Sequence, residues 1–142
     1  MLQSRSIEKV MEEPVRKMVT KRLIGVISGT PLRTGVSRML EFDIEFLAVT
    51  EAGKVVGFIT DSNVMRAVAD GVSMDVPIDE VMTRDPIFVD VNTPVREVLN
   101  LMSRNRVKYL MVTGGDEVEG IITLKDLEDI TRQRIETHIS RE

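Results

Sequence analysis

Hydrophobic and polar residues follow one another along this chain in a pattern that predicts short helices and strands in a repeated order. Near the start, apolar residues recur at helical spacing and Pro14 interrupts them, so we expect one or two short helices there. Two series of elements follow, each in the order β-α-β-β-α. The first is expected at residues 24–27, 31–40, 46–49, 55–60 and 61–70, and the second at residues 87–91, 94–102, 109–112, 118–123 and from 124 onward.

The two series are copies of each other. Residues 24–67 align with residues 87–130 at a constant offset of 63 without gaps, and 13 of the 44 pairs are identical. Average residue usage gives about three identities by chance. A half of about 60 residues buries its sheet poorly when alone. We therefore expect an α/β (α+β) fold in which the two β-α-β-β-α repeats pack sheet to sheet about a pseudo-twofold axis.

These repeats divide the chain into four predicted parts. An N-terminal helical segment covers residues 1–12, and the first repeat covers residues 13–73. The second repeat covers residues 74–136, and the end of the last helix covers residues 137–142.

Each repeat ends in a strand that runs directly into a helix. Thr123 stands three residues before Asp126 at this junction, and Thr60 stands three residues before Asn63. This spacing is typical of a capping box, which satisfies the free N–H groups of the first helical turn. The same N–H groups and the helix dipole also form a phosphate site in many proteins. The motif alone leaves both readings open.

A threonine followed by proline precedes the first helix of each repeat. Thr30-Pro31 and Thr93-Pro94 predict an N-cap followed by proline at the first helical position.

Composition excludes several classes of function. The chain of 142 residues carries a net charge of −4, which disfavours duplex nucleic acid and anionic membrane surfaces as partners. It has no cysteine, which fits a reducing cytoplasm and excludes thiolate chemistry. Its only histidine, His138, has no predicted partner for a metal site. We find no nucleophile, base and orienting residue in one pattern, so we expect no enzyme.

The repeated motifs resemble a known family. The second repeat carries Met82-Thr83, Ile87, Thr93-Pro94 and the runs 107–112 and 120–126; the first carries the weaker set Lys17-Met18, Ile24, Thr30-Pro31 and the runs 47–49 and 57–63. In this order the chain resembles a stand-alone pair of CBS domains, the nucleotide-sensing modules named after cystathionine β-synthase. The resemblance implies a twofold-symmetric fold, a homodimer in the form of a flat disc, and clefts for AMP, ADP, ATP or S-adenosylmethionine. It implies regulation of an unidentified partner protein rather than catalysis.

The resemblance also implies roles for individual residues in one cleft. Asp126 would accept hydrogen bonds from the two ribose hydroxyls, while Thr123 and the helix N-terminus would bind the α-phosphate. Lys108 occupies the position of a basic residue that faces the phosphates. The adenine would lie among residues of both halves, namely Thr20, Ile24, Ile44, Val107 and Ile121.

The second cleft, at Thr60, Asn63, Thr83 and Ile87, differs in its chemistry. Asn63 replaces the aspartate, and Glu45 stands where Lys108 stands in the other repeat. A carboxylate near a phosphate is repulsive. We therefore expect one good nucleotide site, near Asp126, and a weaker or empty one near Asn63.

Three hypotheses follow for the function. The first is an adenine-nucleotide sensor that needs no cofactor beyond this regulatory ligand. The second is a ligand-free module for dimerisation or partner docking, and a related alternative is a binder of S-adenosylmethionine. The third, a small enzyme acting on nucleotides, lacks a visible catalytic set. The outer helix faces are expected to form the dimer contact, through Leu32, Val36, Met39 and Leu40 in one repeat and Val95, Val98, Leu99 and Met102 in the other.

Overall fold

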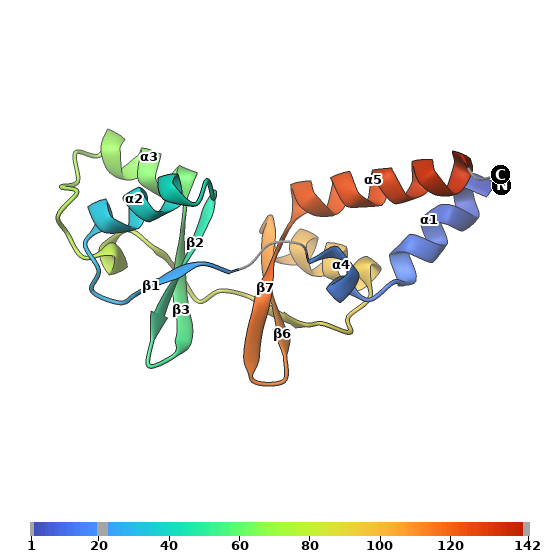
Figure 1. Ribbon diagram of the computed structural model, residues 1–142, viewed down its shortest axis with the longest axis horizontal. Coiled ribbons are helices and arrows are strands. Elements are labelled where there is room, and N and C mark those ends of the chain that lie inside the picture. Colours follow the sequence, from blue (N-terminus) through green and yellow to red (C-terminus); the bar gives the residue numbers. More distant parts are fainter. Residues whose placement is uncertain (1, 20–22, 141–142) are drawn as a thin grey trace. The chain divides into compact units, whose positions relative to one another are not determined.

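The computed structural model describes residues 2–19 and 23–140 (Figure 1). The first elements are α1 (Leu2–Glu12), the short 3-10 helix η1 (Val15–Met18), β1 (Gly25–Ile27), α2 (Leu32–Glu41), β2 (Phe46–Glu51), β3 (Lys54–Thr60) and α3 (Asp61–Ala69). The second series comprises η2 (Ile78–Glu80), β4 (Thr83–Arg84), β5 (Phe88–Asp90), α4 (Val95–Asn105), β6 (Tyr109–Gly114), β7 (Glu117–Thr123) and α5 (Leu124–Ser140). The predicted β-α-β-β-α order is confirmed in both repeats.

The elements form two compact units, which are described separately. Unit 2 comprises residues 23–86, and unit 1 combines residues 2–19 with residues 87–140. The short helices η1 and η2, each of which precedes one β-α-β-β-α series, therefore pack with the other series. The predicted parts 13–73 and 74–136 are defined by the repeated sequence. The two units are defined by which residues pack together, so their bounds differ from those of the parts.

Unit 2 contains a four-stranded sheet with the order β1-β2-β3-β4. Strands β1 and β2 are parallel, and β2, β3 and β4 follow one another in antiparallel pairs. The edge strand β4 was not predicted, because two residues are too short to show a strand pattern. Helices α2 and α3 pack on one face of the sheet around a core formed by Leu32, Met39, Leu47, Val49, Ile59, Ala67, Ile78 and Met82.

Unit 1 contains the three-stranded sheet β5-β6-β7, again with one parallel and one antiparallel pair. Its core joins residues from both ends of the chain, namely Val10, Val15, Met18, Val89, Val95, Val98, Met102, Leu110, Val112, Ile122 and Leu127. Helix α1 packs against α5 and α4. Figure 1 shows α1 and α5 running side by side toward the two ends of the chain.

The helices that follow Thr-Pro do not begin as predicted. Pro31 is the N-cap residue of α2 and the helix starts at Leu32, with no side-chain cap. The Thr30 hydroxyl instead donates to the carbonyl of Ile27 at 2.6 Å. The first free N–H groups of α2, those of Leu32 and Arg33, donate to carbonyls of residues 76 and 74 at 2.9 and 2.8 Å. The N-cap prediction for Thr30 was wrong because a distant segment supplies the acceptors.

The same correction applies to Thr93 in unit 1. Pro94 is the N-cap residue of α4 and makes no side-chain cap. The N–H of Val95 donates to the carbonyl of Glu13 at 2.9 Å. In both units the segment before a repeat therefore caps the first long helix of the unit in which it packs.

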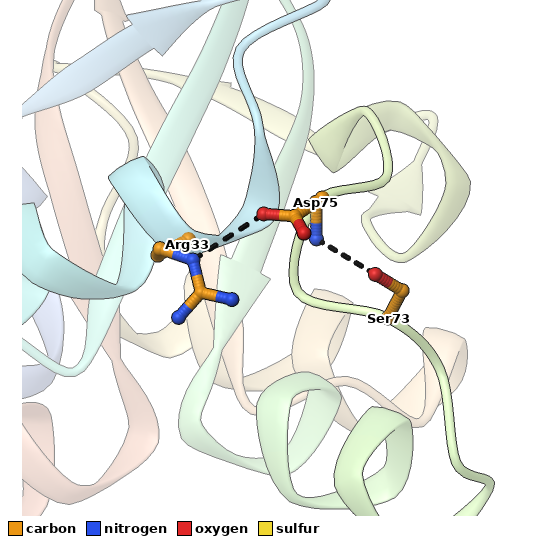
Figure 2. Close-up of polar contacts among 3 residues, drawn as sticks. All are labelled: Arg33, Ser73 and Asp75. Atoms are coloured by element: carbon orange, nitrogen blue, oxygen red, sulfur yellow. Dashed lines mark hydrogen bonds and ion pairs between the residues drawn. The ribbon is translucent and has the colours of Figure 1, made fainter.

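An ion pair accompanies each of these contacts. In unit 2 the Nε atom of Arg33 lies 3.3 Å from the carboxylate of Asp75, whose own N–H donates to Ser73 Oγ at 3.1 Å (Figure 2). In unit 1 the Nε atom of Arg96 lies 2.9 Å from the carboxylate of Glu12. The two pairs are related by the offset of 63, so the duplication retained the contact. Both pairs are exposed, and each contributes less than about 1 kcal/mol.

Asp79 fixes the short helix η2 to unit 2. Its carboxylate accepts hydrogen bonds from the Ser28 hydroxyl at 2.5 Å and from the Gly29 N–H at 2.6 Å. These two bonds hold the pKa of Asp79 below its ordinary value, with a smaller contribution from Arg84. At the corresponding place in unit 1, the guanidinium of Arg16 donates to the side-chain oxygen of Asn92.

The apolar helix faces expected to form the dimer contact mostly point into the cores. Leu32, Met39, Val95, Val98 and Met102 are buried, and Val36 and Leu99 are half-buried. Only Leu40 is exposed. Most of each face therefore covers the sheet of its own unit, and the dimer contact through these helices stays a prediction.

Candidate functional site

Three of the predicted site residues meet at the start of α5 in unit 1. The N–H of Asp126 donates to the Thr123 hydroxyl at 3.1 Å, which confirms the hydroxyl half of the predicted cap. The N–H of Leu124 donates to the carbonyl of Lys108 at 2.8 Å. In the sheet, Tyr109 is paired with Thr123. Lys108 is therefore held beside the first turn of α5.

This arrangement has the chemistry of an anion site with a neighbouring hydroxyl-binding group. The N-terminus of α5 supplies the positive end of a helix dipole. Lys108 is exposed and adds a full positive charge. The half-buried Asp126 supplies carboxylate oxygens, which accept hydrogen bonds from hydroxyl groups. Burial raises the pKa of Tyr109, so its phenol stays neutral beside this site.

The apolar residues predicted for the adenine are distributed between the two units. Val107 is half-buried and packs against the core of unit 1. Ile121 is buried, and strand alternation places it on the opposite face of the sheet from the core residue Ile122. Ile24 and Ile44 belong to unit 2 and pack against its core. Thr20 lies outside the described residues.

The second predicted cleft contains a closed hydrogen-bond network in unit 2. The side-chain oxygen of Asn63 accepts from the N–H and the hydroxyl of Thr60 at 2.9 and 2.8 Å. Its amide group donates to the carbonyl of Val81 at 3.3 Å and to the Thr83 hydroxyl at 3.1 Å. An amide offers two donors and two acceptor lone pairs, and all four are used here. With the bond from the Asn63 N–H to Thr60, they complete the predicted capping box of α3.

Sequence reasoning predicted the cap but missed the bonds that the Asn63 amide makes beyond it. An aspartate could not donate to Val81 and Thr83, so the amide is what joins α3 to the approach to β4. The signal in the sequence was the amide itself at a position where the other repeat has a carboxylate. Ile87, the remaining residue predicted for this cleft, belongs to unit 1 and packs against its core.

The described residues show no sign of two other kinds of site. They contain no group of three or more histidine, cysteine, aspartate or glutamate residues able to hold a metal ion. Within the same ranges, no helix has the length and apolar character needed to cross a membrane.

Comparison with known proteins identifies the fold that carries these residues. The family model of the CBS domain matches the chain twice, over residues 15–70 and 78–130. This chain is a CBS domain pair. A solved structure of an uncharacterized conserved protein from Pyrococcus horikoshii is 37% identical and superposes with a TM-score of 0.78, covering 86% of this chain and 94% of that one.

Two other solved CBS structures contain adenosine compounds. The CBS domain pair of protein MJ0100, in complex with 5′-methylthioadenosine and S-adenosyl-L-methionine, is 25% identical with a TM-score of 0.74, covering 85% of this chain and 97% of that one. The CBS domain protein PAE2072 from Pyrobaculum aerophilum, complexed with AMP, has the same TM-score at 18% identity, covering 87% and 98%. The second likeness shows the fold alone.

Relatives of this CBS pair include longer proteins. An uncharacterized 33.4 kDa protein from Thermofilum pendens is 30% identical over 103 residues, which are 72% of this chain. The present chain spans about a third of that relative, since the match covers 34% of its length.

Proposed function

We propose that this CBS domain pair binds one phosphate-bearing adenosine ligand, of the AMP, ADP or ATP class, at the start of α5. The observation that carries the proposal is the bond from the Leu124 N–H to the Lys108 carbonyl at 2.8 Å. It keeps a cation beside the helix N-terminus that holds Thr123 and Asp126. The ligand's phosphate would meet Lys108, the Thr123 hydroxyl and the positive end of the α5 dipole, and its ribose hydroxyls would meet Asp126.

In this proposal the ligand is a signal and not a substrate. Occupancy at the start of α5 is relayed to a partner protein, and the chain itself performs no reaction. The lack of cysteine fits a reducing cytoplasm, where we place this sensor. The adenosine compounds bound to MJ0100 support the ligand class at the level of the adenosine group.

The same structure favours a second candidate, an S-adenosylmethionine or methylthioadenosine binder. The two candidates differ in charge at the end of the ligand. The sulfonium cation of S-adenosylmethionine is repelled by Lys108 and by the positive end of the helix dipole, and the neutral thioether of methylthioadenosine is not attracted to them. A phosphate is attracted to both. We therefore favour the phosphate-bearing class for this chain.

The network around Asn63 supports a single site per chain. Its amide has no donor or acceptor left for a ribose, because Thr60, Val81 and Thr83 use all of them. Glu45 directly precedes Phe46, which is paired with Thr60, so a negative charge lies where unit 1 presents Lys108. Both features oppose nucleotide binding at the start of α3.

Calorimetry and thermal unfolding with AMP, ATP, adenosine, methylthioadenosine and S-adenosylmethionine test the proposal. We expect about one nucleotide per chain. At a hundredfold excess over the dissociation constant, the ligand should stabilise the fold by about 2.7 kcal/mol. That corresponds to a rise in melting temperature of about 5–15 °C for a chain of this size. Asp126→Ala should remove most of this rise, and Asn63→Ala should keep it.

The comparison uses the ligand-induced rise within each variant, because Asn63→Ala also breaks the cap of α3 and lowers the ligand-free melting temperature. If the rise in melting temperature survives in Asp126→Ala and disappears in Asn63→Ala, the ligand binds near Asn63 in unit 2, and the proposed site at the start of α5 is wrong. Lys108→Glu should narrow or reverse the preference for AMP over adenosine. Equal binding of AMP and adenosine by the unmodified chain would show that no phosphate is recognised, and tighter binding of S-adenosylmethionine would favour the second candidate.

A further inference from the structure

The loop that joins α4 to β6 carries three positive charges at alternating positions. Arg104 lies in the last turn of α4, Arg106 is the C-cap residue of this helix, and Lys108 directly precedes β6. All three side chains are exposed, and among the described residues none of them takes part in a salt bridge. We call Arg104, Arg106 and Lys108 the basic loop. Its last residue is the lysine that is held beside the start of α5.

The corresponding loop of unit 2 has the same turn and the opposite charge. In each unit, two N–H groups of the turn donate to carbonyls of the preceding helix at 3.3 and 3.0 Å, those of residues 106 and 107 in unit 1 and of residues 43 and 44 in unit 2. At the offset of 63, the three residues of the basic loop correspond to Glu41, Asp43 and Glu45. The turn therefore forms with either sign of charge, and the fold does not explain the three cations.

Arg106 has a backbone conformation that is unfavourable for arginine. Its φ angle is 53° and its ψ angle is 41°, which is the left-handed region that glycine enters without strain. Asp43 has a φ angle of 51° at the corresponding position, where its short polar side chain is better tolerated because it can bond to the nearby backbone. An arginine lacks this compensation, and strained residues are concentrated at functional sites. The conformation of Arg106 thus indicates a role for its side chain outside the fold.

The basic loop extends the proposed phosphate site beyond a single phosphate. Val107 packs against the core of unit 1, so the exposed side chains of Arg106 and Lys108 on either side of it both leave the loop toward solvent. Two residues of chain span at most about 7 Å, a length that a chain of linked phosphates can follow. A guanidinium binds phosphate oxygens through two parallel hydrogen bonds. A ligand with one phosphate would use Lys108 and leave both arginines without an anion.

We propose that the ligand of unit 1 is a nucleoside polyphosphate, whose first phosphate lies at the start of α5 and whose further phosphates are bound by Arg106 and Arg104. This inference rests on the proposed function and selects ATP and ADP over AMP within the proposed class. Arg106 and Arg104 determine this specificity, because only the additional phosphates reach them. The acidic residues at the same positions of unit 2 would repel such a ligand.

Calorimetry of the full chain with AMP, ADP and ATP, in buffer free of divalent cations, tests the inference. Wild type should bind ATP at least about tenfold more tightly than AMP, with ADP between them. Arg106→Gly should lower the affinity for ATP at least about fivefold and leave the affinity for AMP unchanged. The melting temperature of this variant should not fall, because glycine relieves the left-handed backbone. A loss of ATP binding in an equally stable chain is not caused by damage to the fold.

Asp43→Gly is the matched control for this substitution. It makes the same change of backbone at the corresponding turn of unit 2, so its melting temperature should not fall either. Its preference for ATP over AMP should equal that of wild type. Arg104→Gln gives a second test, because it removes the other positive charge and keeps a residue that favours helix. This variant should also lose affinity for ATP and keep its affinity for AMP.

The outcomes separate this inference from the proposed function. Equal binding of AMP and ATP by wild type would overturn the inference and leave the proposed function intact, because the first phosphate is still bound. Absence of binding by every adenosine compound would overturn both. The assignment to the basic loop is wrong if the ATP preference persists in both Arg106→Gly and Arg104→Gln. It is equally wrong if Arg106→Gly weakens AMP as much as ATP, or if Asp43→Gly reduces the preference to the same extent.

Discussion

Gly57 shows how closely β3 approaches the neighbouring strand β4 and the residue before it, Met82. A Cβ atom at this position would lie 2.5 Å from the Met82 sulfur and 2.7 Å from the Thr83 carbonyl oxygen. The carbonyl belongs to the backbone of β4 and cannot move without breaking the strand pair. We expect Gly57→Ala to lower the free energy of unfolding by about 1–3 kcal/mol, as measured by urea denaturation.

Gly114→Ala provides the comparison for this residue. Its added Cβ atom would meet only the side chain of Glu119, at 2.6 Å from a carboxylate oxygen. That flexible group can turn away, so the cost should stay below about 0.5 kcal/mol. If Gly57→Ala and Gly114→Ala lower the free energy of unfolding by similar amounts, the close contact with β4 is not the cause of the destabilisation by Gly57→Ala.

At single positions, the sequence predicted contacts made within one element better than contacts between elements. The three-residue spacing of Thr60 and Asn63 is a local signal, and the capping box is confirmed. The bonds from Asn63 to Val81 and Thr83 span 18 and 20 residues, and no local pattern reveals them. The candidate site at Lys108, Thr123 and Asp126 was predicted from the family resemblance together with the cap.

Among the elements, η2 offers a pH-dependent test, because Asp79 ties it to Ser28 and Gly29, the two residues that follow β1. Its pKa is lowered in the folded chain, mainly by the hydrogen bonds from Ser28 and Gly29. Because the pKa is lower in the folded state than in the unfolded state, the charged carboxylate stabilises the fold. This stabilisation is fully present at pH values above the unfolded-state pKa of about 3.9. This stabilisation is lost as the pH falls through the folded-state pKa.

We therefore expect Asp79→Ala to cost about 1–2 kcal/mol of unfolding free energy at pH 7, and a smaller amount in acid below pH 4 or so. Urea denaturation at several pH values measures both. Asp75→Ala removes an exposed ion pair with Arg33 and should cost less than about 1 kcal/mol. A loss for Asp79→Ala that does not change with pH would exclude the charged form as its cause.

The helices and most strands could be predicted from hydrophobic spacing, but the way two helices start could not. Thr30 and Thr93 looked like N-caps because threonine before proline is a common helix start. The structure uses carbonyls of residues 74, 76 and 13 instead. These carbonyls belong to segments more than 40 residues away in the sequence. They reach the helix start only when the whole unit is packed.

The short helix η1 packs in unit 1 and η2 packs in unit 2, and this arrangement gives a prediction for the whole molecule. Val15 of η1 and Ile78 of η2 correspond at the offset of 63, and both are fully buried, in units 1 and 2 respectively. Val15→Ala should lower hydrogen-exchange protection by about 2–4 kcal/mol in β5, β6 and β7, although these strands lie more than 70 residues away. Protection in β1, β2 and β3 should change less.

Ile78→Ala should show the opposite pattern, with the larger loss of protection in β1, β2 and β3. The two variants control each other, because each truncates the corresponding side chain in one unit. Equal losses in all strands for both variants would show that the units open together and not as separate bodies.

Unit 1 is formed by two stretches of the chain that are separated by unit 2. This arrangement determines which unit can fold first during synthesis on the ribosome. Residues 2–19 leave the exit tunnel first, yet the residues they pack against begin at Ile87. At about 5–20 residues per second, the 80 residues between Val15 and Val95 take about 4–16 s to synthesise. All residues of unit 2 are synthesised in that interval, whereas most residues that form a core with Val15 and Met18 are not yet synthesised. A nascent chain stalled after unit 2 has emerged should resist protease within residues 23–86 and be cut within residues 7–19.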